Sequence, residues 1–264
     1  MAEFDTVIRG GTVVDGTRLP RYLADVAIKA GRIVEIGHVE AHRAQQVIDA
    51  AGCIVAPGFV DLHTHYDAQL FWDPYCSISC WHGITSVAIG NCGFGFAPVT
   101  PAARERAMLS MTRVEAIPLA SMRAGMPWDW ESFPEYLDSI ERTPKAMNIL
   151  PYVPISPILI SVLGLDDAKA GRLPTEAEHA EMCRILELSL DAGGCGWSAQ
   201  RLPPTGPAGV QLGGEWRRIQ RAKGYRYVLI NGEVTLEDDE QTHRYSGQLL
   251  RHGSTSRQLN RQAA

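Results

Sequence analysis

Short runs of alternating apolar and polar residues fill the first fifty positions of the chain. Turn signals separate these runs, which occupy residues 4–11, 12–16, 25–29, 32–37 and 46–50. Alternation with a period of two predicts half-buried strands, and Ala30-Gly31 predicts a hairpin turn. We therefore expect a small antiparallel β unit at the start of the chain. A similar hairpin is expected at residues 225–236, with its turn at Asn231-Gly232.

From residue 54 onward, strand-like apolar runs alternate with helical stretches. The strands are expected at residues 54–60, 84–90, 147–154 and 194–199. The helices are expected at residues 101–116, 132–139 and 175–192. The last helix is the clearest, because Thr175 and Glu178 form a capping box and Gly193-Gly194 ends the periodic pattern. This alternation predicts parallel strands joined by crossover helices.

Composition narrows the classes of function. The chain has 264 residues, of which 45% are hydrophobic and 21% charged, as in an ordinary globular protein with a real core. Its net charge of −5 argues against nucleic acid or an anionic membrane as a partner. No apolar run is long enough to cross a bilayer, and the first residues lack the pattern of a secretory signal. Six scattered cysteines favour a reducing cytoplasm over a disulfide scaffold.

Two histidines at positions i and i+2 provide the strongest chemical signal. His63 and His65 directly follow the apolar run 54–60. Strand side chains alternate faces, so both imidazoles are expected on one side, where they form half of a divalent-metal site. The alternative is a pair of exposed loop histidines. Two acids stand nearby, and each is a candidate to orient a metal-binding imidazole: Asp61 and Asp67. An ordinary structural role is equally open for Asp61.

Cys92 follows the next expected strand, within a glycine-rich run at residues 90–95. In a (β/α) barrel the carboxyl ends of the strands meet on one face, where catalytic residues gather. Cys92 is therefore a candidate thiolate ligand on the same rim as the two histidines. The alternative is a small buried residue before a turn.

Several segments resemble the N-acyl-D-amino-acid deacylases (D-aminoacylases) of the amidohydrolase superfamily. The Gly-Asn-Cys-Gly run at 90–93 is specific to that branch, and the other similar segments are residues 5–16, 56–67, 81–85 and 227–234. The resemblance implies a (β/α)8 barrel beside a β-sandwich assembled from both chain ends. It also implies Zn²⁺, with Cys92 standing where relatives have a carboxylated lysine or a glutamate, and with His63 and His65 at a second, weaker metal position. N-acyl amino acids are the implied substrates.

The chain departs from this family in length. About four barrel strands can be found, so the expected fold class is α/β, with an incomplete TIM-type barrel at 54–211. A β-sandwich from residues 1–53 and 212–253 is expected beside it, and 254–264 are expected to form a disordered tail. We infer that a large internal segment is missing relative to the family, and with it two later histidines, a catalytic aspartate and the substrate-binding groups. No catalytic residue is therefore assigned, and weak metal binding with low turnover is expected.

Two other functions remain open from the sequence. A non-catalytic remnant would associate with another chain, or with a second copy of itself, through the open strand edges of half a barrel. A cyclic-amide hydrolase such as a dihydroorotase or hydantoinase would share the His-x-His start. The aromatic group at Trp128, Trp130, Phe133 and Tyr136 would either line a substrate entrance or pack a loop onto the barrel.

Overall fold

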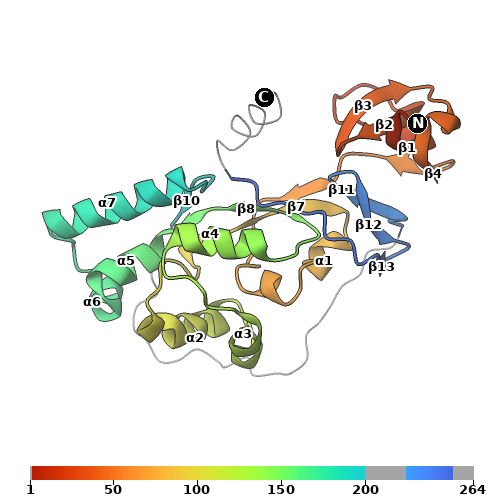
Figure 1. Ribbon diagram of the computed structural model, residues 1–264. Helices are drawn as coiled ribbons and strands as arrows, with labels where there is room; N and C mark the ends of the chain where they lie inside the picture. Colours follow the sequence, from red (N-terminus) through yellow and green to blue (C-terminus); the bar gives the residue numbers. More distant parts are fainter. Residues whose placement is uncertain (1, 200–223, 252–264) are drawn as a thin grey trace.

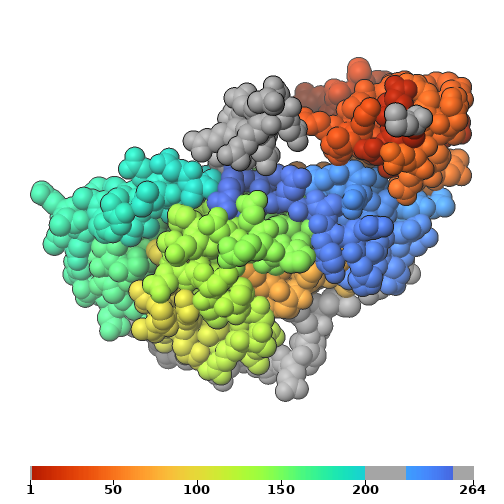
Figure 2. Space-filling view, in the orientation of Figure 1, coloured from red at the N-terminus to blue at the C-terminus, as the bar shows by residue number. Residues whose placement is uncertain are grey.

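The computed structural model describes residues 2–199 and 224–251. Figure 1 shows three regions: an N-terminal sheet that stands apart, a central parallel sheet with helices around it, and a C-terminal sheet between the two. In Figure 2 the red-to-orange N-terminal sheet forms a lobe that meets the blue C-terminal strands. In the part of the chain that is described, no helix combines the length and the apolar character needed to cross a membrane.

The N-terminal lobe is a five-stranded sheet built around one long strand. Its strands are β1 (Phe4–Val13), β2 (Tyr22–Lys29), β3 (Arg32–Gly37), β4 (Ala44–Asp49) and β5 (Ile54–Val55). The two strands expected at 4–11 and 12–16 are one strand, because β1 absorbs a register shift between Ile8 and Gly11 and continues. The sheet is also not purely antiparallel, since β4 and β5 both run parallel to β1.

The strand expected at 54–60 is in fact two strands in two different sheets. β5 pairs with β1 of the N-terminal lobe, whereas β6 (Phe59–Asp61) pairs with β7 (Ile84–Ile89). Pro57 separates them, and its missing N–H group and fixed φ interrupt a continuous ladder. This break marks the passage from the N-terminal lobe to the parallel sheet.

The central strands are parallel and follow chain order, as the alternating pattern predicts. β6, β7 and β8 (Asn148–Pro151) form one sheet, and β9 (Val153–Pro154) pairs with β10 (Trp197–Ser198). The strand expected at 147–154 is therefore divided at Tyr152, whose N–H donates to the carbonyl of Ile89. The four strand positions expected from sequence are present, and whether they make part of a barrel stays a prediction.

Helices cover the central strands. The 3-10 helices of this region are η2 (Gln69–Phe71), η3 (Asn91–Gly93) and η4 (Pro101–Ala103), after η1 (Ala41–Arg43) in the N-terminal lobe. The α-helices are α1 (Ser77–Cys80), α2 (Arg104–Val114), α3 (Leu119–Gly125), α4 (Phe133–Arg142), α5 (Ile155–Leu163), α6 (Leu165–Ala170) and α7 (Glu176–Asp191). The three helices expected from sequence correspond to α4, α7 and the combined η4 and α2.

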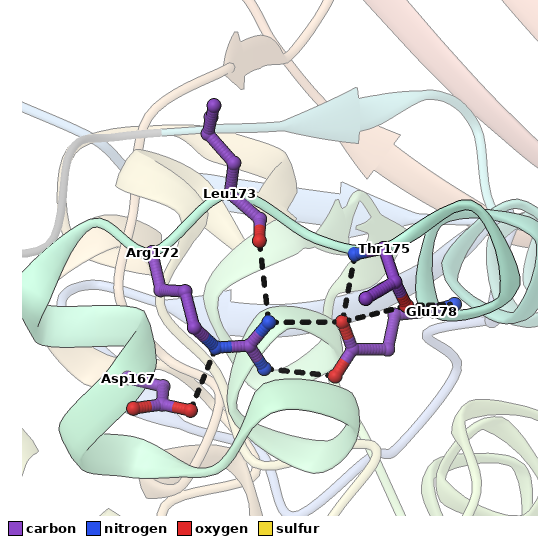
Figure 3. A network of polar contacts seen from close by, with 5 residues as sticks. All are labelled: Asp167, Arg172, Leu173, Thr175 and Glu178. Carbon is purple, nitrogen blue, oxygen red and sulfur yellow. Dashed lines mark hydrogen bonds and ion pairs between the residues drawn. The ribbon is translucent and has the colours of Figure 1, made fainter.

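The start of α7 shows why its sequence signal was clear. The Thr175 hydroxyl accepts from the Glu178 N–H at 3.3 Å, and the Glu178 carboxylate accepts from the Thr175 N–H at 2.8 Å, which completes the capping box. Figure 3 shows that two guanidinium nitrogens of Arg172 donate hydrogen bonds to the same carboxylate, and that the third nitrogen donates to Asp167 on α6. The network ties the turn between α6 and α7 to the first turn of α7.

The main core lies between the central sheet and its helices, and it includes the aromatic group noted in the sequence. Trp130, Phe133 and Tyr136 are almost fully buried. The ring of Trp130 stacks on Phe71 with centroids 5.3 Å apart, and its indole N–H donates to the Phe96 carbonyl at 2.9 Å. These three side chains therefore pack the core and do not line a substrate entrance.

The C-terminal sheet consists of β11 (Tyr227–Ile230), β12 (Glu233–Glu237) and β13 (Glu240–Gln241). Its hairpin turns at Asn231-Gly232 as expected, with positive φ at both residues. Val228, Ile230 and Leu236 enter the main core, while Leu229 packs against the N-terminal sheet. The two end sheets are not hydrogen-bonded to each other within the described residues, and the composite sandwich stays a prediction. The boundary at 211–212 and the tail at 254–264 lie outside the described residues.

Candidate metal centre

The structure brings His63, His65 and Cys92 together. One nitrogen of each ring and the sulfur of Cys92 all lie within 4.8 Å of one another. The His63 Nε2 is 3.1 Å from the Cys92 Sγ, and the two imidazole rings are 5.5 Å apart. In the described part of the chain, this is the one group of His, Cys, Asp and Glu that offers three donor atoms for a single ion.

The two histidines and Cys92 lie together for a different structural reason from the one expected. β6 ends at Asp61, so His63 and His65 lie in the turn that follows, and strand alternation does not place them on a common side. Cys92 lies within η3, just after β7, with a positive φ of 54°. Because β6 and β7 are parallel neighbours, their carboxyl ends lie at the same edge and bring the two turns together.

The three candidate ligands differ in exposure and in protonation. His63 is exposed, whereas His65 and Cys92 are partly buried. Burial, with a smaller effect of the neighbouring His63, lowers the pKa of His65 and keeps its ring neutral near pH 7. Burial and the negative charge of Glu115 raise the pKa of the Cys92 thiol. The thiol is therefore protonated unless a cation is close by.

Asp61 and Asp67 both act on the main chain. The Asp61 carboxylate accepts from the His63 backbone N–H at 3.0 Å, so it shapes the turn; the structure shows no bond from it to the imidazole among the described residues. Asp67 is 1% exposed, and its Oδ1 accepts from the Gly90 N–H at 2.8 Å. Burial raises the pKa of Asp67 to about 7. Asp67 therefore fastens the turn after β6 to the end of β7.

A fourth group at this edge was not found from the sequence. Glu115 caps the C-terminus of α2, and its Oε1 lies 3.5 Å from the His65 Nε2. Its side chain is 20% exposed, and burial raises the pKa of its carboxyl. Glu115 belongs to no motif, and its approach to the site depends on how α2 packs. Sequence spacing carries no signal for it.

One buried atom of the donor group has no hydrogen-bond partner. Within the described residues, the Nδ1 of His65 is shielded from solvent and unpaired. Buried polar atoms are normally satisfied, and unpaired ones cost free energy. Two imidazoles and a thiol are also the donor types that zinc prefers. The residues present therefore fit a divalent ion.

Two other histidines, far along the chain, do not join this group. His179 lies on α7, 3.8 Å from the sulfur of Cys183, one helical turn further on. His243 is exposed after β13. Neither belongs to the group of described residues that offers three donor atoms.

Comparison with known proteins places this chain in a family. A profile of the amidohydrolase family matches residues 46–194, which include His63, His65 and Cys92. The chain is 34% identical to N-acyl-D-aspartate deacylase of Alcaligenes xylosoxydans xylosoxydans over 78% of its length and 39% of that protein. It is 32% identical to N-acyl-D-glutamate deacylase of the same organism, over 90% of its length and 45% of that protein.

A solved structure agrees with these matches. N-acyl-D-glutamate deacylase of Bordetella bronchiseptica, complexed with zinc and a phosphonate inhibitor, superposes with a TM-score of 0.61 at 32% identity. The superposition covers 75% of this chain and 38% of that one. The chain spans less than half the length of the curated relatives it matches. The resemblance to D-aminoacylases is confirmed, and the chain belongs to the amidohydrolase family.

Proposed function

We propose that this chain is a metal-dependent amidohydrolase that cleaves the linear amide bond of N-acyl-D-amino acids. The observation that carries the proposal is the grouping of His63, His65 and Cys92, whose donor atoms lie within 4.8 Å of one another. The similarity to deacylases of N-acyl-D-aspartate and N-acyl-D-glutamate supports this class of substrate. The solved deacylase that binds zinc and a phosphonate supports a divalent ion.

Zn²⁺ is the ion that suits the donor set, because two neutral imidazoles and a thiolate are borderline-soft ligands. When bound, it would lower the pKa of a coordinated water toward about 7 and polarise the amide carbonyl. The chain's own contribution is to hold the donors in place. The low pKa of His65 keeps the ring free of a proton, and the Asp67 bond to the Gly90 N–H fixes the two turns relative to each other.

We expect slow turnover from this chain. Removing the leaving amine requires a group that passes a proton to it, and substrate binding requires groups that hold its carboxylate. The relatives are about twice as long as this chain, and we assign neither role to any of the described residues. The impairment expected from the sequence is thus part of the proposal.

The test combines metal analysis with a deacylation assay. The purified chain is loaded with zinc, passed through a desalting column and analysed for metal, and amine release from N-acetyl-D-glutamate is then followed. We expect weak but detectable zinc binding in the wild-type chain, less zinc in Cys92→Ser and in His63→Ala, and slow zinc-dependent release. Cys183→Ser, which changes an exposed thiol on α7, is the matched control. Equal zinc in wild type and Cys92→Ser would contradict the proposal.

Self-association is a second candidate property, and the edge strand β6 favours it. Phe59, Val60 and Leu62 are 58%, 55% and 59% exposed, although strands of parallel sheets are normally covered on both faces. β6 is also the end strand of its sheet, with one side unpaired among the described strands. A second copy of the chain would cover this edge. Light scattering after size exclusion tests it: we expect dimers that Val60→Lys dissociates, and a monomeric wild type contradicts the idea.

The expected cytoplasmic location stays a prediction. All six cysteines are free, a state that a reducing compartment maintains. Cys76 and Cys80 are fully or largely buried, and burial raises the pKa of both thiols. Cys76 and Cys80 are therefore unreactive residues of the core.

A further inference from the structure

A short segment near the end of the chain runs beside β8 as an additional strand (Figure 1). Residues 246–251 form this closing segment, and Leu249 lies opposite Ile149 in a parallel bridge. The Ile149 N–H donates to the Gln248 carbonyl, and the Leu250 N–H donates to the Ile149 carbonyl, both at 2.8 Å. The closing segment therefore satisfies main-chain groups on the side of β8 that faces away from β7.

The continuation of this edge pairs with a different part of the chain. The Cys195 N–H donates to the Pro151 carbonyl, and the Val153 N–H donates to the Gly196 carbonyl, each at 2.9 Å. β9 and β10 then pair in parallel. Two segments that are far apart in the sequence thus share the outer edge of β8 and β9. The closing segment covers the first half of this edge, which the short strand β10 does not reach.

Side chains also hold the closing segment in place. Leu249 is 9% exposed and belongs to the main core. A methyl group at Gly247 would overlap the main chain of Met147, so a residue with a side chain could not take this place unless β8 moved. Arg251 donates to two carboxylates on α4 and to a main-chain carbonyl that follows α7. The closing segment is therefore fitted to the edge and does not merely pass over it.

The opposite edge of the same sheet differs. β6 is the other end strand, its outer side is unpaired among the described strands, and Phe59 and Val60 are exposed there. β6, β7 and β8 are all parallel, so β6 of a second copy could extend the sheet beyond β8 in the same direction. Such pairing joins two different edges and can continue from copy to copy, whereas a sheet with one closed edge cannot grow in this way.

We propose that the closing segment is an edge cap. It occupies the edge of β8 that would otherwise accept β6 of a second copy, and so prevents head-to-tail polymerisation of this short chain. The inference rests on the self-association proposed above only in taking the β6 edge as available. It does not require the wild-type chain to associate, because a monomer and a dimer joined through two β6 edges both leave the edge of β8 capped.

The experiment displaces the closing segment in the full-length chain and measures mass by light scattering after size exclusion. Leu249→Asp places a charge in the core, whereas Leu250→Asp, at a neighbouring position that is 36% exposed, is the matched control. We expect Leu249→Asp to form species of three or more chains whose mass rises with concentration, and Leu250→Asp to keep the wild-type mass. Adding Val60→Lys to Leu249→Asp should return the mass to that of Val60→Lys alone, because the β6 edge is then blocked.

A second readout is hydrogen exchange at the Ile149 amide, which donates to the closing segment. In the double variant, which keeps β6 blocked, this amide should exchange at least about tenfold faster than in Val60→Lys. Faster exchange in Leu249→Asp at an unchanged mass overturns the proposal, because an open edge then attracts no partner. Oligomers that survive Val60→Lys overturn it as well, because β6 is then not the partner.

Gly247→Ala displaces the same segment without adding a charge, and it decides the question if circular dichroism shows that Leu249→Asp does not fold. An unchanged mass and an unchanged Ile149 exchange rate in Gly247→Ala would show that the closing segment does not hold the edge. A monomeric wild type contradicts only the self-association proposed above, whereas the masses of the variants decide this inference.

Discussion

The substitution Gly90→Ala tests how tightly the turn that carries Cys92 is built. Gly90 joins β7 to η3 with φ of 78° and ψ of 16°, in the left-handed region. Its N–H donates to Asp67 at 2.8 Å. A methyl group at this position would overlap the carbonyl oxygen of Tyr152 and lie 3.0 Å from the carbonyl carbon. Carbon atoms in contact normally stay about 3.5 to 4.0 Å apart. The backbone at Tyr152 must therefore move.

The expected cost has two parts. A left-handed conformation costs a residue with a Cβ about 1 to 2 kcal/mol relative to glycine. Forcing extra volume into packed structure typically costs about 1 to 3 kcal/mol more. We therefore expect Gly90→Ala to lower the free energy of unfolding by about 2 to 5 kcal/mol. Gly171→Ala is the matched control, since Gly171 has φ of 71° but nothing within 4 Å of the added methyl. Its cost is limited to the conformational part.

Urea denaturation of the wild type and both variants is followed by tryptophan fluorescence. The loss in free energy of unfolding is obtained from the shift of the urea midpoint, provided that the dependence on urea concentration is unchanged. The difference between the variants isolates the overlap with Tyr152 from the backbone preference. If Gly90→Ala and Gly171→Ala lose the same free energy within error, the close approach of Gly90 to Tyr152 is not a constraint, and the argument for a rigid Cys92 turn fails.

Two further predictions concern the helices and the core. Thr175→Ala removes the hydroxyl that caps α7 and is expected to lower the free energy of unfolding by about 1 kcal/mol in urea titrations; an unchanged midpoint would contradict the capping role. Burial lowers the pKa of Lys145. As the pH rises, the folded state therefore loses the Lys145 proton at a lower pH than the unfolded state does. The contribution of Lys145 to stability is thus fully present above its unfolded pKa and is lost as pH falls through the folded pKa. Lys145→Met should lack this rise in stability as the pH approaches about 10.5, and parallel stability curves for the two proteins would refute the prediction.

Local sequence signals predicted α4 and α7, whereas the sequence did not indicate that β5 and β6 pair with strands of different sheets. Both helices begin with a capping box, at Ser132 and Thr175, which is encoded within four residues. The break between β5 and β6 depends instead on β1, which lies some forty residues earlier and takes β5 as its partner. The helix α5 was missed because its residues are almost all apolar, so no period of 3.6 separates it from the strand before it.

Three residues of the candidate site were predicted from the sequence, but one of the two reasons given for their grouping is wrong. His63, His65 and Cys92 were expected to meet because neighbouring parallel strands end at one edge, and they do meet. The expected alternation along the strand is wrong, because both histidines lie beyond β6. Glu115 follows a helix whose position depends on packing across the main core, so no pattern in the sequence could indicate it.

The turns that carry these side chains are bonded directly to each other. The turn after β6 is bonded to β7 at several points: the Thr64 N–H and hydroxyl both donate to the Ala88 carbonyl, and the Asn91 amide donates to the carbonyls of Thr64 and Ala88. The bond from Gly90 to Asp67 adds another link. Every one of these bonds lies within residues 64–91, so the two turns are linked directly to each other, while later residues such as Tyr152 and Ser198 also contact the Cys92 turn. A substrate-binding cleft, in contrast, needs loops from many strands. A chain with few parallel strands can therefore bring candidate metal ligands together while it lacks the loops that form a substrate-binding cleft.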